Sequence, residues 1–336
     1  LLLGLAAVLA FTGVSNVCAA EILVYTALED DELAIYMKDW EAKYPDIKAN
    51  IVRDSTGIVT AKLLAEKDNP KGDVWYAGTL DPHSQAGVND LLEPYESPML
   101  KEIGEEFRNP ATSKQHHSAG VYAGVLGYSV NTDVLKEKNL PMPRSWEDLT
   151  KPEYKGLVQV ASPQSSGTAY TVLATMVQLK GEEEAFEYLA KLHQNVNQYT
   201  KSGSAPGKAA ARGETMIGIG FLHDHALQKA NGFPLELVVP SEGTGYEIGG
   251  LSIIKGARNM ENAKKFVDFM LSAEGQEVPQ RVKMFQVPTN VNANVPKEAI
   301  RLDQVKLIDS NAETARRLSE RLDKAIVLLG DAADEE

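Results

Sequence analysis

The first part of the chain repeats one pattern, in which a short segment of strand type is followed by a segment with helical spacing. Segments 22–25, 47–51 and 73–77 combine apolar and β-favouring residues and predict strands. Residues 33–44 place apolar side chains at i, i+3, i+4 and i+7, and residues 58–67 form a second helical segment. Strands that alternate with helices predict a parallel α/β sheet, because parallel neighbours need a crossover connection.

The carboxyl ends of these predicted strands carry hydroxyl side chains. Thr26 follows the first strand, Ser55 and Thr56 follow the second, and Thr79 follows the third. Ligands of open α/β sheets bind in the crevice outside the carboxyl ends of the strands. We therefore expect these four hydroxyl groups to form a polar rim beside a ligand.

A strand-type segment at 120–130 contains three glycines and predicts a strand that crosses from a first lobe to a second. Further strands are expected at 158–161 and 216–220, with a helix at 169–180 between them and a return crossing near 235–240. A length of 336 residues suits two lobes. The sequence thus predicts an α/β protein whose mixed, mostly parallel sheets are joined by a two-strand hinge.

The crossings also predict where the lobes divide. We expect an N-terminal lobe made of residues 21–123 and 241–282 and a C-terminal lobe made of residues 124–240 and 283–336. Each lobe would then combine two stretches of chain that lie far apart in the sequence.

Residues 1–20 differ from the rest of the chain. Residues 1–17 are apolar and uncharged, and they run into Cys18, Ala19 and Ala20 before the acidic Glu21. An apolar segment that ends in a small-residue site is typical of a secretory signal peptide. We expect a signal peptide, truncated at its start and cleaved near Ala20, which predicts a periplasmic protein whose mature chain lacks cysteine.

The charge balance excludes two classes of partner. Lys and Arg total 34 against 47 Asp and Glu, for a net charge of −13, and no basic block interrupts this trend. Nucleic acids and anionic membrane surfaces attract basic patches. Neither partner is expected.

The segment 162–168 places hydroxyls and a glycine where a strand turns into a helix. Free backbone N–H groups and the helix dipole make such a corner suitable for an anion. The candidate anion-binding residues here are Ser165, Ser166, Gly167 and Thr168. Ser55 and Thr56 repeat the arrangement in the first lobe. The same residue types are also good helix N-caps, so a purely structural role stays open.

A second polar cluster follows the strand at 216–220. His223, Asp224 and His225 are consecutive, and Glu247 lies beside two glycines later in the chain. His223, Asp224 and Glu247 could form a clamp for sugar hydroxyls, since they offer donors and acceptors. Two histidines and an aspartate could instead begin a zinc site, although no third imidazole is obvious. A simple surface turn is the remaining alternative.

Signatures of catalysis are lacking in the sequence. Residues 203–209 superficially resemble a P-loop, but the segment is one residue short and Ala209 replaces the required Ser or Thr. No G-x-S-x-G elbow, H-E-x-x-H motif or G-x-G-x-x-G after a strand occurs. We therefore expect no enzyme and assign no catalytic residue, cofactor or metal.

Seven segments spread over the chain from residue 21 onward carry a family resemblance. They are ILVYTALED, DSTGIVTAKLLAEKDNP, GDVWYAG, GVYAGVLGYSVNTDVL, SPQSSGT, YTKSGSAPGKAAARGE and GLSIIKGARNMENAKKFVDFMLSAEGQ. Together they resemble the periplasmic solute-binding proteins of ABC importers, in the ferric-binding-protein-like group. DSTGIVTAKLLAEKDNP is especially similar to branches that bind organic phosphates and phosphonates. The resemblance implies a type II periplasmic binding fold.

The resemblance also implies roles for individual residues. The family's anion pocket corresponds to Ser165, Ser166, Gly167, Thr168 and Ser202. Ferric members hold their metal with an adjacent tyrosine pair, and this chain has Leu222, His223 and Asp224 at that place. His223, Asp224 and Glu247 match the pattern of the hexose-phosphate branch, where these side chains would bind sugar hydroxyls.

The implied function is capture of a phosphorylated sugar, with a hexose phosphate as the first choice, by hinge closure. The protein would act as a monomer and present this ligand to an inner-membrane ABC permease. Three alternatives stay open: 2-aminoethylphosphonate or another organophosphonate, ferric iron, and a zinc-dependent hydrolase built on His223 and His225.

Overall fold

A computed structural model of the chain describes residues 20–108 and 117–308. Apart from Ala20, the expected signal peptide lies outside the described residues, and so does the part of the predicted C-terminal lobe after residue 308. Among the described residues, no helix is both long and apolar enough to cross a membrane.

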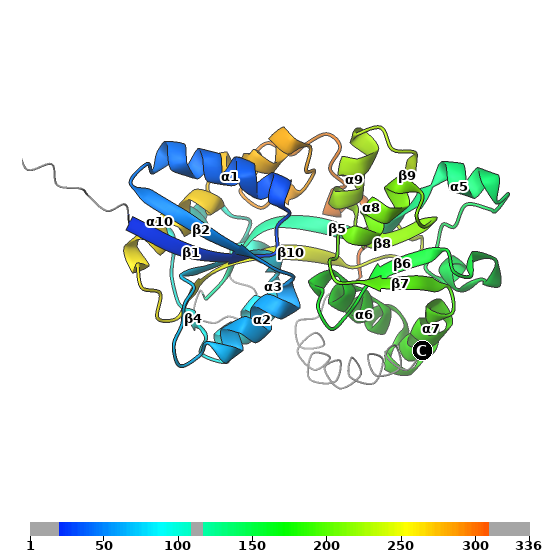
Figure 1. The fold of residues 1–336 in the computed structure, drawn as a ribbon, viewed down its shortest axis with the longest axis horizontal. Coiled ribbons are helices and arrows are strands. Elements are labelled where there is room, and N and C mark those ends of the chain that lie inside the picture. Colours follow the sequence, from blue (N-terminus) through cyan, green and yellow to red (C-terminus); the bar gives the residue numbers. More distant parts are fainter. Residues whose placement is uncertain (1–19, 109–116, 309–336) are drawn as a thin grey trace, which may run out of the picture.

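One end of the molecule is built on three parallel strands, as the alternating pattern predicts. β1 (Ala20–Thr26) lies between β2 (Ile47–Arg53) and β3 (Val74–Thr79), and it pairs in parallel with both. β10 (Tyr246–Ile254) joins β3 in the antiparallel direction, so this part of the sheet is mixed. The connecting helices are α1 (Asp30–Lys43), α2 (Thr56–Ala65) and α3 (Leu80–Val88). β1 and β2 end at the edge that faces the other half of the molecule (Figure 1), and β3 runs parallel to β1.

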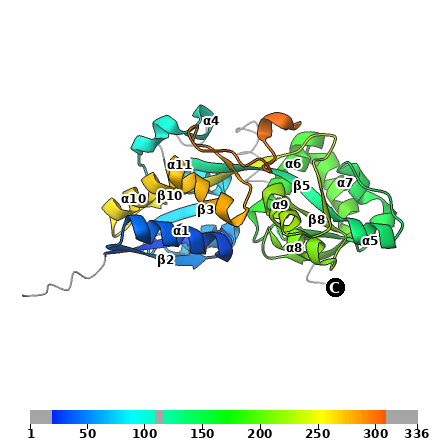
Figure 2. The same ribbon diagram turned by 90° about the horizontal axis from the view of Figure 1, so that it is seen from above.

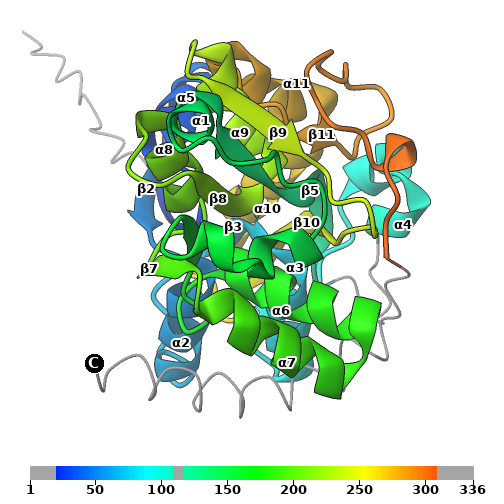
Figure 3. The same cartoon turned by 90° about the vertical axis from the view of Figure 1, so that its right-hand side faces the viewer.

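The other end has its own strands and helices. Its strands are β6 (Val158–Ala161), β7 (Val196–Thr200), β8 (Ile217–Phe221) and β9 (Leu235–Val238). Its helices are α5 (Thr132–Glu137), α6 (Gly167–Lys180), α7 (Glu182–His193), α8 (Ala205–Arg212) and α9 (Leu222–Ala230). In Figure 3, α6 and α7 cover one face of this sheet, and α8 and α9 cover the other.

The two ends are joined by β5 (Ala119–Asn131), which runs through both. Its first half pairs with β10, and its second half pairs with β8 and β9, so the strand order is β2-β1-β3-β10-β5-β8-β6-β7. Figure 2 shows β5 passing from one end to the other. The predicted crossing strand at 120–130 is therefore confirmed.

The remaining elements are short or lie on the periphery. They are β4 (Leu92–Glu93), α4 (Glu105–Arg108), α10 (Met260–Leu271), α11 (Ala273–Glu277), β11 (Val287–Pro288) and the 3-10 helices Pro98–Glu102, Glu147–Thr150, Pro152–Tyr154, Val278–Val282 and Leu302–Gln304.

Each end has a separate hydrophobic core. In the first, Trp40 of α1 and Phe266 of α10 pack with their ring centroids 5.1 Å apart under the sheet. In the second, Trp146 packs edge to face on Tyr128 of β5 at 5.8 Å. Aromatic side chains contribute most to burial because of their large apolar area. Two separate cores let each lobe keep its internal packing if the lobes move.

One detail of the predicted topology is wrong. The segment expected to return near 235–240 is β9, which pairs only with the second half of β5. The return comes later, where Tyr246 of β10 pairs with Val125. Our boundaries between the lobes stay a prediction. β11 falls within the predicted C-terminal lobe, and it pairs with Tyr122 and Ala123 in the first half of β5.

Candidate functional site

A cavity with an empty volume of about 540 Å³, partly open to solvent, lies between the two lobes. Its lining combines the carboxyl ends of β1, β2 and β3 with the amino ends of α6, α8 and α9. The strand-end rule used in the sequence analysis therefore points to this region.

Two helix starts, one from each lobe, meet directly at this cavity. The Gly57 amide in the first turn of α2 donates a hydrogen bond of 3.1 Å to the Ser165 carbonyl, just before α6. A Cβ atom placed on Gly167 would lie 2.6 Å from Thr79 Oγ1 and 3.1 Å from Thr56 Oγ1. The hydroxyls of Thr56 and Thr79 thus lie against the start of α6, and a residue larger than glycine at position 167 would force them to shift.

Most residues predicted to bind the anion line this cavity. They are Ser55, Thr56, Thr79, Ser166, Gly167, Thr168 and Ser202. Two others do not. The Thr26 hydroxyl is fully buried and accepts from the Leu28 amide at 3.2 Å. The Ser165 hydroxyl donates to the Lys201 carbonyl at 2.9 Å. Thr26 and Ser165 therefore hold backbone in the cavity wall and do not face its interior.

The predicted sugar-binding residues lie together in the same lining. His223 and Asp224 belong to the first turn of α9, and Glu247 comes from β10. His223 Nε2 is 3.7 Å from Asp224 Oδ1 and 3.6 Å from Glu247 Oε1. The imidazole is stacked parallel to the Phe221 ring and meets the Tyr122 ring edge to face. This packing fixes the orientation of the imidazole between the two carboxyl groups.

Burial shifts the protonation of this cluster toward neutral forms. It raises the pKa of Asp224 to about 7, with a further contribution from the negative charge of Glu29. Burial and the nearby Asp224 and Glu32 raise the pKa of Glu247 well above its usual value. Burial also lowers the pKa of His223 to about 3. Neutral carboxyl and imidazole groups can both donate and accept, which suits them to hydroxyl groups.

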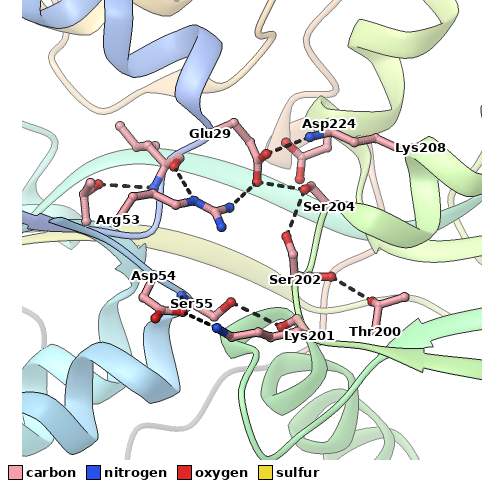
Figure 4. Close-up of polar contacts among 12 residues, drawn as sticks. Glu29, Arg53, Asp54, Ser55, Thr200, Lys201, Ser202, Ser204, Lys208 and Asp224 are labelled. Atoms are coloured by element: carbon pink, nitrogen blue, oxygen red, sulfur yellow. Dashed lines mark hydrogen bonds and ion pairs between the residues drawn. The ribbon is translucent and has the colours of Figure 1, made fainter. Parts of the chain in front are cut away.

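The structure adds a polar network that the sequence analysis missed. Glu29 precedes α1 and accepts from Arg53 Nη2 at 2.6 Å, from Ser204 Oγ at 2.8 Å and from Lys208 Nζ at 2.7 Å (Figure 4). Burial alone would raise the pKa of Glu29, but its bonds to Lys208 and Ser204 and the charge of Arg53 hold that pKa below its usual value. Glu29 is therefore an ionised group that joins the two lobes.

A second contact joins the lobes at the α2 corner. Lys201 Nζ lies 3.1 Å from Asp54 Oδ1, and Ser55 Oγ donates to the Lys201 carbonyl at 3.2 Å (Figure 4). Arg53 is the last residue of β2, and Glu29 follows β1 closely. The expectation that ligands bind at strand ends, which selected Thr26 and Ser55, could therefore have selected these two residues as well. Their partners on the other lobe had no such signal.

The cavity lining holds further residues that were not predicted. The polar or aromatic ones are Glu32, Tyr122, Phe221 and Gln286. Glu32 is 2% exposed, and its Oε1 atom has no hydrogen-bond partner among the described residues. In the sequence, Glu32 resembles an ordinary acidic residue in the first turn of a helix.

The structure places His225 apart from the cavity lining. Its ring packs against Gly207 and Gly220, where an added Cβ would lie 2.4 and 2.7 Å from ring atoms. Among residues 20–108 and 117–308, no three His, Cys, Asp or Glu side chains are arranged to hold a metal ion. Leu222 and His223, which the resemblance places where ferric members have their tyrosine pair, are both buried.

Comparison with known proteins gives four similarities. Residues 77–312 match the family described as bacterial extracellular solute-binding protein. A protein of Haemophilus influenzae is 50% identical over 311 residues, which cover 92% of this chain and 89% of that protein. The periplasmic binding protein AfuA from Actinobacillus pleuropneumoniae, solved with exogenous fructose-6-phosphate bound, has 48% identity and a TM-score of 0.87, covering 92% of this chain and 99% of AfuA. The periplasmic binding protein P5PA has 39% identity and a TM-score of 0.85, with 91% and 99% coverage.

Proposed function

Because the chain belongs to the family of bacterial extracellular solute-binding proteins, we propose that its interlobe cavity binds a phosphorylated sugar, with a hexose phosphate as the best candidate. The fold is that of a type II periplasmic binding protein. The observation that carries the proposal is the meeting of the α2 and α6 corners at a cavity that also holds His223, Asp224 and Glu247.

The phosphate would bind where the two corners meet. The hydroxyls there belong to Ser55, Thr56, Thr79, Ser166, Thr168 and Ser202. They stand beside the amide groups at the starts of α2 and α6, where the helix dipoles favour negative charge. Arg53 adds a positive charge to the lining. Hydroxyl and amide donors of this kind can hold a phosphate group without a dedicated metal ion.

The sugar would extend toward His223, Asp224 and Glu247. A sugar hydroxyl donates one hydrogen bond and accepts others, and it is best paired with groups that do both. The neutral imidazole and the carboxyl groups with raised pKa values provide such partners in a buried setting. A ligand without these hydroxyls would leave buried polar groups unpaired, which costs free energy.

The similarity to AfuA supports the same ligand class, since AfuA was solved with fructose-6-phosphate and aligns over 92% of this chain. We extend the proposal to transport. The protein would act in the periplasm as a monomer that closes on its ligand and presents it to an inner-membrane ABC permease. The contacts of Glu29 and Asp54 with the second lobe are those that a closed state would gain.

A thermal-shift experiment tests the ligand class. Fructose 6-phosphate and glucose 6-phosphate should raise the unfolding temperature, because ligand at 100 times its dissociation constant adds about 2.7 kcal/mol of stability. Fructose and glucose serve as matched controls that lack the phosphate, and inorganic phosphate lacks the sugar. Equal shifts with and without the sugar would contradict the proposal.

A second candidate is 2-aminoethylphosphonate, which the carboxyl groups of Asp224 and Glu247 favour. They lie in the same cavity as the anion corners, so an ammonium group bound there would lower their raised pKa values and pair with the carboxylate that forms, while a phosphonate occupies the hydroxyl rim. The same thermal-shift experiment separates the two candidates. A shift with 2-aminoethylphosphonate and none with either sugar phosphate would favour this ligand.

A further inference from the structure

Behind the cavity, a histidine that does not line it is fully enclosed between two strands. His83 of α3 is 0% exposed, and its ring is stacked on Trp75 of β3 with the centroids 3.6 Å apart and the planes at 16°. On β10, a Cβ atom placed on Gly250 would lie 2.5 Å from His83 Cδ2. The ring therefore fills the space between β3 and the glycine of β10.

Both ring nitrogens of His83 have polar partners, and these partners define the tautomer. Nε2 is 3.2 Å from the Ala77 carbonyl, which only accepts, so Nε2 carries the hydrogen. Nδ1 is 2.8 Å from Ser252 Oγ and accepts from that hydroxyl. Burial lowers the pKa of His83 to about 3, so the ring is neutral and keeps one donor and one acceptor. A directed relay thus runs from Ser252 on β10 to Ala77 of β3.

The carbonyl that His83 holds belongs to the irregular last part of β3, residues 77–79, which we call the turn because the backbone bends there before α3. Ala77 has φ of 62° and Gly78 has φ of 84°, so two consecutive residues adopt the left-handed region before α3 begins. For a residue with a Cβ atom this conformation costs roughly 1–2 kcal/mol, and it persists only where surrounding contacts impose it. The bond from His83 Nε2 is such a contact.

This turn delivers two residues into the cavity lining, Gly78 and Thr79. A Cβ on Gly78 would lie 2.6 Å from Thr56 Oγ1, so the turn also abuts the α2 corner. Thr79 is buried, with 4% of its surface exposed, and its Oγ1 atom has no hydrogen-bond partner among the described residues. The backbone of Thr79 pairs with Gly249, beside a register shift in β10. An unpartnered buried hydroxyl at this place is aimed at a ligand or at the start of α6.

We propose that His83 is a positioning residue for the binding site: its Nε2–H group holds the Ala77 carbonyl and thereby sets the Gly78–Thr79 turn that presents the Thr79 hydroxyl. His83 itself touches no ligand. Its effect on affinity passes through Thr79, and this consequence separates positioning from a general contribution to stability. The part of the proposal that concerns affinity rests on the proposed sugar-phosphate function, whereas the part that concerns the turn does not.

Two substitutions divide the contacts of His83. His83→Asn keeps an amide near Ser252 but is too short to reach the Ala77 carbonyl. His83→Gln carries an N–H donor near the position of Nε2. We expect the asparagine variant to bind fructose 6-phosphate roughly 3- to 10-fold more weakly, the size expected for one lost hydrogen bond, and the glutamine variant to recover most of that loss.

A double-mutant cycle with Thr79→Ala tests the path of the effect. If His83 acts through the Thr79 hydroxyl, His83→Asn should weaken binding by less than about 2-fold in the Thr79→Ala background. An equal loss in both backgrounds overturns the proposal. Ile253→Val, a buried substitution next to Ser252 on β10, is the control that lowers stability while it leaves the relay intact.

Hydrogen–deuterium exchange without any ligand supplies a readout that does not need the proposed function. His83→Asn should speed exchange of peptides that cover residues 76–82 more than exchange of the rest of the lobe. If that variant fails to fold, Ser252→Ala removes the other end of the relay and should produce the same local change. Uniform acceleration, or no change at 76–82, overturns the proposal. If His83→Asn shows the exchange effect but the wild type does not bind fructose 6-phosphate, the positioning role stands and the sugar-phosphate function is rejected.

Discussion

Lys208 Nζ in α8 lies 2.7 Å from Glu29 Oε2 at the start of α1, so an ion pair joins the second lobe to the first beside the cavity. The side chains of Lys208 and Glu29 are 38% and 24% exposed, and Glu29 also accepts from Ser204 and Arg53. This network links the two lobes, and none of its residues belongs to either hydrophobic core.

We predict that Lys208→Met favours the open state. Loss of the cation leaves Glu29 with one charged partner fewer, and fructose 6-phosphate should bind about 2- to 5-fold more weakly, as for a partly exposed ion pair. Small-angle scattering with saturating ligand should show a larger radius of gyration than for the wild type. Lys151→Met, which removes a lysine paired with Asp148 within one lobe, is the control. The same scattering curve for both variants would contradict the prediction.

Gly167→Ala should separate ligand binding from stability. In the middle of a helix, alanine is more stable than glycine by roughly 0.5–1 kcal/mol, and at Gly167, the first residue of α6, alanine gains at most part of this. Here its Cβ would lie 2.6 Å from Thr79 Oγ1 across the lobe interface. We expect an unfolding temperature without ligand that is equal to or above that of the wild type, together with at least a tenfold loss of affinity for fructose 6-phosphate. Isothermal titration calorimetry measures the second effect, and unchanged affinity would show that the lobes close without this contact.

Glu247→Ala should weaken binding of the sugar more than binding of the phosphate. The substitution leaves His223 and a sugar hydroxyl without their partner, which costs about 1–3 kcal/mol in a buried site. Binding of fructose 6-phosphate should fall by that amount, while any binding of inorganic phosphate should be unaffected. Glu236→Ala on β9 removes a half-exposed carboxylate that pairs with Arg144 and Lys229, and it is the matched control. A similar loss of affinity for fructose 6-phosphate and for inorganic phosphate would place Glu247 outside the sugar site.

The raised pKa of Asp224 predicts a pH dependence of folding. The pKa of Asp224 is about 7 in the folded protein against a usual value of 3.8, so the folded state binds more protons than the unfolded state between these values. Wild-type stability should therefore fall, relative to Asp224→Asn, as the pH rises from about 4 to 7, and the difference should then stay constant. At about 1.36 kcal/mol for each pH unit, the difference is on the order of 4 kcal/mol at most.

Chemical denaturation of both proteins at pH 5, 6, 7 and 8 measures this difference. The comparison with Asp224→Asn is needed because His223, whose pKa is lowered to about 3, has the opposite effect on stability over part of the same range. A difference that does not change with pH would show that Asp224 ionises normally in the folded protein.

Local patterns in the sequence were sufficient for much of the fold. Alternation of strand and helix segments predicted β1, β2 and β3 with α1 and α2, and the glycine-containing run at 120–130 predicted β5. The alternation and the glycine-containing run depend only on residues close together in the sequence, and hydrophobic periodicity detects patterns of that kind. β9 was misplaced because a strand's partner, unlike its existence, depends on residues more than 100 positions away.

The sequence by itself determined which chemistry reaches the strand ends: hydroxyls at Thr56 and Thr79, a glycine at 167, and His223 with Asp224 after β8. Only the tertiary structure decided which of these groups face a common cavity. It turned Ser165 onto the Lys201 carbonyl, and it brought Glu29 to Lys208 and His83 to Ser252. The physical reason is that side-chain direction and contact across a lobe interface depend on how distant segments pack, and local sequence carries no signal of that packing.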